Sequence, residues 1–238
     1  MTYAILAVTW GVWLFVQGAG FDAQHLAATV CNLGLVPGEL THLARIGSSV
    51  PIGEGMACIV DRDAINKFTP LTSMFLHGSW MHIIGNSLFL WVFGNNVEDS
   101  MGRGRYLAFY LLCGLAAAGA QILSDPSSAV PMVGASGAIS GVMGAYLLLY
   151  PKVRVRMLFI FIIIFRVFRI PAWMVLLWWF ALQLLASVNG GMGGVATWAH
   201  VGGFVAGMAL VKLFEDPNLV AAHRTRLAPY LDGRAYDY

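Results

Sequence analysis

The chain has 238 residues, of which 58% are hydrophobic and only 11% are charged, and its formal net charge is +2. Soluble domains carry about 25% charged residues, so this composition excludes an ordinary soluble domain and predicts a multi-pass membrane protein. The small net charge gives no indication of nucleic-acid binding. The three cysteines form neither a disulfide framework nor a metal-type spacing. Cys31 and Cys58 share one loop, where they either pair or remain two free thiols.

Six apolar segments follow one another along the chain. Each has about 18 residues or more, the length that a helix rising ~1.5 Å per residue needs to cross a ~30 Å hydrocarbon core. We therefore expect an all-α fold, a polytopic bundle of six transmembrane helices over residues 3–20, 71–97, 106–123, 129–150, 171–188 and 195–214. The first segment contains Trp10 and Trp13 and has no basic region before it, so it is interpreted as a span rather than a signal peptide.

These spans define one membrane domain over residues 1–214, followed by a short tail over residues 215–238. The apolar run 157–165 is flanked by arginines and would measure only about 14 Å as a helix, too short to span. We expect the surrounding segment, 151–170, to lie at the membrane interface on the cytoplasmic side.

The distribution of Lys and Arg predicts the orientation of the spans. The loops after spans two and four, the tail and Lys212 at the end of span six together hold eleven of these residues, whereas the loops after spans one, three and five hold three. Positive residues accumulate on the cytoplasmic side, so both termini are expected in the cytoplasm and the long loop 21–70 outside. A prokaryotic plasma membrane is the expected location.

Histidines are the ionisable side chains within the predicted spans that precede Lys212: His77 and His82 in the second span and His200 in the sixth. An ionisable group inside a membrane is costly and indicates a functional site. With the predicted orientation, His82, His200 and Ser136 of the fourth span all lie in the outer half of the membrane, within one or two helical turns in depth.

The small residues of the fourth and sixth spans predict that these two helices pack closely. His200, Gly203 and Gly207 share one face of the sixth span, and the two glycines form a GxxxG surface. The fourth span offers a matching face of small residues: Gly137, Ser140, Gly141 and Gly144. Close approach of the two helices would bring Ser136 Oγ within hydrogen-bond distance of a His200 ring nitrogen.

A serine beside a histidine has the groups that acyl transfer needs. Serine requires a neighbouring base, and imidazole, with an ordinary pKa of about 6.5, accepts and returns the proton. His82 and Asn86, four residues apart on one helix face, supply N–H donors for an oxyanion beside the Ser136 backbone N–H. The predicted spans hold no carboxylate to orient His200, so the catalytic unit is expected to be a dyad.

Three motifs on spans two, four and six resemble those of the rhomboid family of intramembrane serine proteases. Residues 134–137 read Gly-Ala-Ser-Gly and resemble the family's GxSG. Residues 199–207 are similar to its AHxxGxxxG, and residues 77–86 match its HxxxxHxxxN. The motifs occur in the family's order, and the resemblance covers nearly the whole chain.

The resemblance implies cleavage of transmembrane segments near their outer end, with Ser136 as nucleophile and His200 as general base. It implies an oxyanion site formed by His82, Asn86 and the Ser136 backbone. The supporting motif residues are Gly134, Gly137, Gly203, Gly207 and His77. The implied partners are transmembrane protein substrates and the lipid bilayer, with no metal or other cofactor.

The chain departs from the family pattern at two places. Some members carry an aromatic residue one turn after the serine that packs against the histidine, but Ser140 stands there in this chain. Tyr146 or a residue from another span substitutes for it, or His200 is held in a different way. Some members also carry a Trp-Arg pair in the first external loop, and the loop 21–70 lacks it, which affects loop structure more than chemistry.

Structural roles compete with functional ones at several residues. Ser136 and His200 taken singly are typical of helix packing, and Asn86 is also typical of a membrane asparagine that joins helices. His77 lies about 140° round a helix from His82, so we expect a structural or water-organising role for it. The glycines at 190, 191, 193 and 194 form either a flexible turn or a lid over the site. The remaining histidines are expected to be solvated: His25, His42 and His223.

Three other functions compete with that of a serine protease. A catalytically idle rhomboid-like protein that binds membrane clients would be favoured by loss of the serine or histidine, and both are present. A transporter usually needs acidic residues or broken helices in mid-membrane, and the predicted spans of this chain hold no carboxylate. A zinc protease could use three histidines, but no Glu follows His77 or His82 in HExxH spacing. The sequence therefore favours the serine protease.

Overall fold

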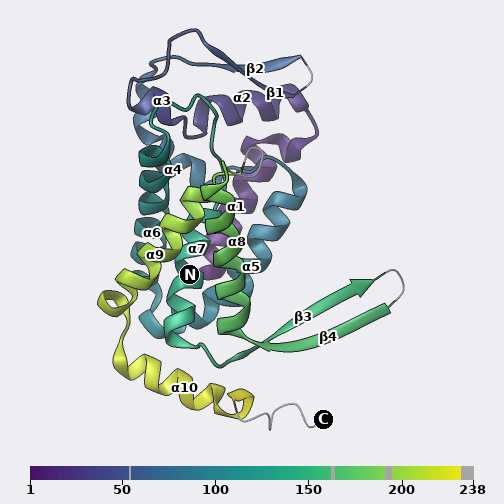
Figure 1. The fold of residues 1–238 in the computed structure, drawn as a ribbon, viewed down its shortest axis with the longest axis vertical. Helices are drawn as coiled ribbons and strands as arrows, with labels where there is room; N and C mark the ends of the chain where they lie inside the picture. Colours follow the sequence, from purple (N-terminus) through teal and green to yellow (C-terminus); the bar gives the residue numbers. More distant parts are fainter. Residues whose placement is uncertain (54, 162–163, 191–194, 232–238) are drawn as a thin grey trace.

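The computed structural model describes residues 1–53, 55–161, 164–190 and 195–231. Most of these residues are helical, and two β-hairpins lie at opposite ends of the helical bundle (Figure 1). The fold is therefore mostly, but not entirely, α-helical. Of the glycines considered as a lid, those at 191, 193 and 194 lie outside the described residues.

Five long helices make up most of the bundle, together with an interrupted helix at its N-terminal end. The long helices are α5 (Trp80–Met101), α6 (Arg103–Ser124), α7 (Ser136–Leu149), α8 (Ala172–Val188) and α9 (Thr197–Phe214). The interrupted one is α1 (Thr2–Gly11), which continues as a π-helical turn (Val12–Val16) and a 3-10 turn (Gly18–Gly20). Within the described residues, α6 and α9 are long and apolar enough to cross a membrane, whereas residues 2–16, α7 and α8 are apolar but shorter. The count of six spans stays a prediction.

Two helices begin later than the apolar segments suggest. Helix α5 begins at Trp80 because the Ser79 side chain caps it, accepting a hydrogen bond from the His82 N–H at 3.2 Å. Helix α7 begins at Ser136 and is therefore only ~21 Å long. The residues before these helices form short turns and loops, including α4 (Thr69–Thr72), so the predicted starts at 71 and 129 are wrong.

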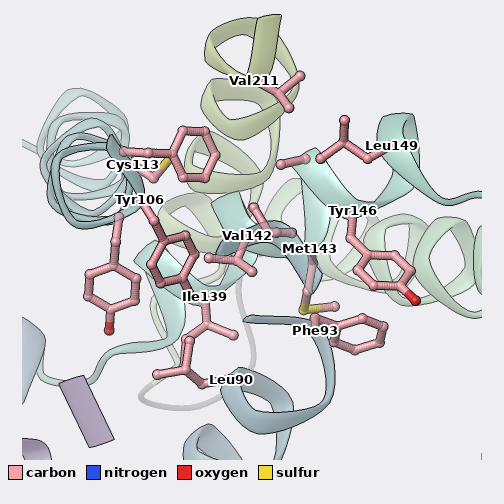
Figure 2. Close-up of a cluster of buried hydrophobic side chains, with 14 of the residues drawn as sticks. Leu90, Phe93, Tyr106, Cys113, Ile139, Val142, Met143, Tyr146, Leu149 and Val211 are labelled. Carbon is pink, nitrogen blue, oxygen red and sulfur yellow. The ribbon is translucent and has the colours of Figure 1, made fainter. Parts of the chain in front are cut away.

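Helix α7 lies at the centre of the bundle. Twelve of its fourteen residues are buried. In Figure 2 its side chains, among them Ile139, Val142 and Tyr146, lie among side chains of α5, α6 and α9 such as Phe93 and Val211. A short helix that is apolar on every side is stable only inside such a bundle. The core therefore fixes the position of Ser136, the first residue of α7.

The expected close packing of α7 and α9 is present. A Cβ atom on Gly203 would lie 2.0 Å from the carbonyl oxygen of Gly137, and one on Gly207 would lie 1.9 Å from that of Gly141. Only glycine permits backbones to approach so closely. The sequence pattern therefore predicted this contact and the residues that make it.

One end of the bundle is covered by the segment 21–70. It contains α2 (Ala23–Leu33), α3 (Pro37–Leu40), a 3-10 turn (Ala64–Phe68) and the antiparallel pair β1 (Ser49–Gly53) and β2 (Met56–Ile59). A disulfide joins Cys31 of α2 to Cys58 of β2, which settles the question of pairing that the sequence left open. Leu35 and Met132 form a β-bridge that ties this segment to the chain just before α7.

The opposite end carries a hairpin and the C-terminal helix (Figure 1). Strands β3 (Arg154–Phe161) and β4 (Ile164–Pro171) pair antiparallel, with Arg154 opposite Pro171. The apolar run therefore lies in strands rather than in a helix, in agreement with the preference of Ile and Phe side chains for strands. The interfacial placement of this segment, and the division into membrane domain and tail, stay predictions.

Helix α10 (Pro217–Leu231) folds back against the ends of α5 and α7. Its His223 is only 6% exposed, with Nε2 2.9 Å from Asn96 Oδ1 and Nδ1 3.2 Å from Asp99 Oδ2. The expectation that His223 is solvated is therefore wrong. Burial lowers the pKa of His223 below its usual value, and the nearby Arg226 also lowers it, whereas Asp99 opposes the shift.

Candidate active site

Ser136 and His200 meet although they are 64 positions apart in the chain. Ser136 begins α7, and His200 lies in the first turn of α9. The Oγ of Ser136 lies 2.8 Å from Nε2 of His200, a hydrogen-bond distance. The glycine contacts between α7 and α9 hold the two backbones at the separation that allows this bond.

Helix α8 holds the other side of the His200 ring. Nδ1 of His200 lies 2.8 Å from Oε1 of Gln183, and the ring centroid lies 5.7 Å from that of Trp179. An amide oxygen only accepts, so this contact is a hydrogen bond when Nδ1 of His200 carries the proton. Helix α8 therefore contacts the His200 ring with one amide oxygen and one aromatic ring.

The question of what replaces an aromatic residue at position 140 therefore has an answer. Ser140 donates its hydroxyl to the Ser136 carbonyl oxygen at 2.6 Å. Tyr146 packs its ring against Phe93, with centroids 5.0 Å apart, on the other side of α7. The residue that packs on His200 comes from another helix, and it is Trp179.

Gln183 and Trp179 were missed by reasoning from the sequence. They lie four residues apart and so share a face of α8. The available signal was that Gln183 is the one amide side chain among the apolar residues 172–188. An amide in such a helix needs a partner, which made it a candidate for contact with a functional group.

His82 and Asn86 lie on the other side of Ser136, against Gly134. A Cβ atom on Gly134 would lie 2.7 Å from His82 Nε2 and 3.6 Å from Asn86 Nδ2. The backbone N–H of Gly78 points to His82 Nδ1 at 3.4 Å, a long hydrogen bond that favours the proton on Nε2. Both side chains therefore present N–H groups beside the start of α7.

His77 joins this group, contrary to the expectation that it faces elsewhere. Its Nε2 lies 2.9 Å from Asn86 Nδ2, and its ring lies 5.0 Å from that of His82. The expectation assumed one continuous helix, but α5 starts at Trp80 and His77 lies in the loop before it. Because Asn86 Nδ2 carries two hydrogens, one can bind His77 while the other stays available.

A buried glutamine fixes the backbone of His77. The side chain of Gln17 is fully buried, accepts from the His77 N–H at 2.8 Å and donates to the His77 carbonyl oxygen at 2.7 Å. Gln17 follows the π-helical turn that ends the first helix, so the N-terminal element holds this side of the site. Its role was not apparent from the sequence.

A cavity of about 650 Å³ lies beside Ser136 and His200, near the end of the bundle where Leu35 of the segment 21–70 pairs with Met132. Ser136, His200, His82 and Asn86 line it together with apolar side chains such as Phe89. Ser136 and His200 are partly exposed. An apolar cavity with a few convergent polar groups is typical of a substrate site.

A serine–histidine pair and convergent N–H donors, set among apolar helices, form an arrangement suited to acyl transfer. The sequence profile of the Rhomboid domain matches residues 66–215. That match covers more than half of the chain, so the chain belongs to the rhomboid family and is an integral membrane protein.

Several characterised relatives are similar to parts of this chain. It is 40% identical over 90 residues to "Rhomboid protease GluP" of Bacillus subtilis, covering 38% of this chain and 17% of that protein. It is 28% identical over 169 residues to "Rhomboid protease AarA" of Providencia stuartii, covering 66% and 57%. It is 29% identical over 156 residues to "Rhomboid protein 1, mitochondrial" of Saccharomyces cerevisiae, covering 60% and 40%. The chain thus spans less than two thirds of the length of each relative.

Proposed function

We propose that this protein is an intramembrane serine protease that cleaves transmembrane segments of other membrane proteins, with Ser136 as nucleophile and His200 as general base. The observation that carries the proposal is the 2.8 Å contact between Ser136 Oγ and His200 Nε2 at the wall of a cavity. Two relatives named rhomboid protease support it.

The proposed reaction begins when a peptide bond of the substrate enters the cavity. Ser136 Oγ attacks the carbonyl carbon and its proton passes to His200 Nε2. The negative oxygen that forms is stabilised by N–H groups of His82, Asn86 and the Ser136 backbone. His200 then protonates the leaving nitrogen, and the carbon–nitrogen bond breaks to leave an acyl-enzyme.

Water completes the cycle. His200 removes a proton from a water molecule that attacks the ester carbonyl. The carbon–oxygen bond to Ser136 then breaks, His200 returns the proton to Ser136 Oγ, and the new carboxyl end of the substrate is released. Water enters the partly exposed site from the side covered by the segment 21–70. We place that side outside the cell and both termini in the cytoplasm, in a prokaryotic plasma membrane, following the Lys and Arg distribution. The substrate helix unwinds near its outer end.

Labelling by a fluorophosphonate tests the nucleophile and base directly. Purified protein in liposomes is treated with the probe as wild type, Ser136→Ala, His200→Ala and Ser140→Ala. We expect labelling of the wild type and of Ser140→Ala, the matched control one turn away in the same helix, and no labelling of the other two. Equal labelling of all four proteins would overturn the mechanism.

Cleavage of a transmembrane reporter in the same liposomes separates the protease from an idle rhomboid-like binding protein. We expect the wild type to cleave it and Ser136→Ala to bind it intact. A folded wild type that binds the reporter without labelling or cleavage would establish the idle protein instead.

A further inference from the structure

Helix α8 carries a polar side chain whose role the proposed reaction has not used. Within Ala172–Val188 the side chains that can form hydrogen bonds, besides the tryptophans, are Gln183 and Ser187. Ser187 donates back to the carbonyl oxygen of Gln183 at 2.8 Å, a contact within the helix. The Gln183 amide instead points away from its own helix, to His200 Nδ1 at 2.8 Å.

The direction of this hydrogen bond decides whether His200 can act as a base. If Nδ1 carries the proton, Nε2 has a free lone pair and can accept from Ser136. If Nε2 carried the proton, it would donate to Ser136 Oγ and no base would be present. With Oε1 facing Nδ1, the Gln183 amide selects the first tautomer.

The surroundings of His200 contain no carboxylate that would do the same. Helices α7, α8 and α9 contain neither Asp nor Glu. In soluble serine hydrolases a buried aspartate holds the histidine tautomer. An ionised carboxylate among apolar helices is costly to desolvate, whereas a neutral amide costs much less.

Trp179 completes the support from the same helix. It lies one turn before Gln183, its ring is 5.7 Å from that of His200, and it also packs 6.1 Å from Phe204 of α9. Packing by Trp179 limits tilting of the imidazole ring, and the amide of Gln183 limits its rotation and sets its proton. The two contacts act on different motions.

We propose that Gln183 is a positioning residue that sets the tautomer and orientation of His200, so that the site works as a serine–histidine–glutamine unit with a neutral third member. This inference rests on the proposed function. It assigns Gln183 no contact with substrate, and it predicts an effect on turnover rather than on substrate binding.

Kinetics of three variants test the proposal with the transmembrane reporter in liposomes. Gln183→Met keeps the side-chain volume but removes the acceptor, and Gln183→Glu keeps an acceptor. Gln121→Met is the matched control, because Oε1 of Gln121 accepts from the N–H of Ala199 at 3.3 Å, next to His200. We expect Gln183→Met to lower kcat about 10- to 100-fold with KM within about twofold. We expect Gln183→Glu to retain kcat within about fivefold and Gln121→Met within about twofold.

A spectroscopic measurement reads the tautomer without depending on activity. Histidine ¹⁵N shifts are recorded in the Ser136→Ala background, with the His200 signals assigned from a variant lacking His200. We expect a protonated Nδ1 and an unprotonated Nε2, and a mixture of tautomers once Gln183→Met is added. Unchanged ¹⁵N shifts together with unchanged kcat in Gln183→Met would overturn the role of Gln183.

The outcomes distinguish this inference from the proposed function. Full cleavage by Ser136→Ala would refute the serine protease, whatever Gln183 does. Loss of cleavage in Ser136→Ala, with normal turnover and unchanged ¹⁵N shifts in Gln183→Met, would refute only the positioning role. Folding is checked by helicity and thermal unfolding, and recovery of turnover in Gln183→Glu distinguishes a lost acceptor from a damaged helix.

Discussion

Gly134 lies so close to His82 that a Cβ atom on it would be 2.7 Å from the Nε2 nitrogen. Its backbone φ is +127°, in a region that residues with side chains rarely adopt. Its N–H donates to the Ser73 carbonyl oxygen at 2.8 Å, which fixes the chain just before the nucleophile. The first glycine of the GxSG motif thus leaves the space that His82 occupies.

Gly134→Ala is expected to lower kcat by about 100-fold or more, because the added methyl group displaces an N–H donor from the oxyanion position. The strained backbone should also lower the free energy of unfolding by about 1–3 kcal/mol. Reporter cleavage and thermal unfolding measure the two effects. Gly119→Ala in α6 is the control, since no neighbouring atom lies within 4 Å of a Cβ there. Normal kcat in Gly134→Ala would mean that His82 does not stabilise the oxyanion.

Gly207→Ala tests whether contact between α7 and α9 holds Ser136 and His200 together. Its Cβ would overlap the carbonyl oxygen of Gly141, so the helices must separate. We expect a loss of about 1–3 kcal/mol in stability and slower fluorophosphonate labelling, because the site depends on that separation. Gly104→Ala, at a position with open space around the Cβ, should change neither. Wild-type labelling and stability in Gly207→Ala would contradict this dependence.

His223 predicts a pH dependence for the docking of α10. Its pKa is lowered in the folded protein, so between that pKa and about 6.5 the unfolded chain binds more protons than the folded one. The free energy of unfolding therefore rises as the pH increases through this window. Below the window both states bind the proton, and the full cost of protonating the buried His223 is present. Resistance of α10 to limited proteolysis should fall on acidification from pH 7 toward pH 5.

His223→Gln should flatten that dependence, because a glutamine can still bind Asn96 but does not titrate. His42→Gln in the segment 21–70 is the control and should leave it unchanged. The charged groups around His223 are Asp99, which is half-exposed, and Arg226. Equal acid sensitivity of the wild type and His223→Gln would assign the effect to those groups instead.

The sequence predicted the contacts that depend on helical spacing and failed where a helix was interrupted. The glycine faces of α7 and α9 follow from residues three and four apart, and they brought Ser136 to His200 as expected. His77 was misplaced because the cap at Ser79, which starts α5 at Trp80 and so leaves His77 outside the helix, was not recognised. The hairpin of β3 and β4 was missed because a short apolar run fits a strand as well as a helix.

Contacts between side chains on different helices could not be predicted from the sequence where no motif marks them. Gln183 contacts His200 because α8 packs against α9 with one rotation rather than another, and the sequence of α8 is apolar on all sides. Gln17 reaches the His77 backbone only because a π-helical turn precedes it. Such rotations are set by packing in three dimensions, which a hydrophobic pattern does not specify.

The disulfide between Cys31 and Cys58 tests the orientation proposed for the bundle. Disulfides persist in oxidising compartments and are rare in the cytosol. If the segment 21–70 lies outside the cell, protein from intact cells should contain this disulfide, while the buried Cys113 thiol stays reduced. Mass spectrometry after alkylation without reductant measures both.

The disulfide between Cys31 and Cys58 should also stabilise the segment 21–70, which covers the site. Closing a loop over a sequence separation of 27 restricts the unfolded chain, which stabilises the folded state by about 3.5 kcal/mol in the chain-entropy description. Cys31→Ser and Cys58→Ser should therefore each make residues 21–70 more sensitive to added protease. The double variant should be no more sensitive than either single variant, because each single change already removes the disulfide. Cys113→Ala is the control for loss of a thiol without a disulfide. Two free thiols at positions 31 and 58 in protein from intact cells would argue for the opposite orientation, because a cytosolic segment would be kept reduced.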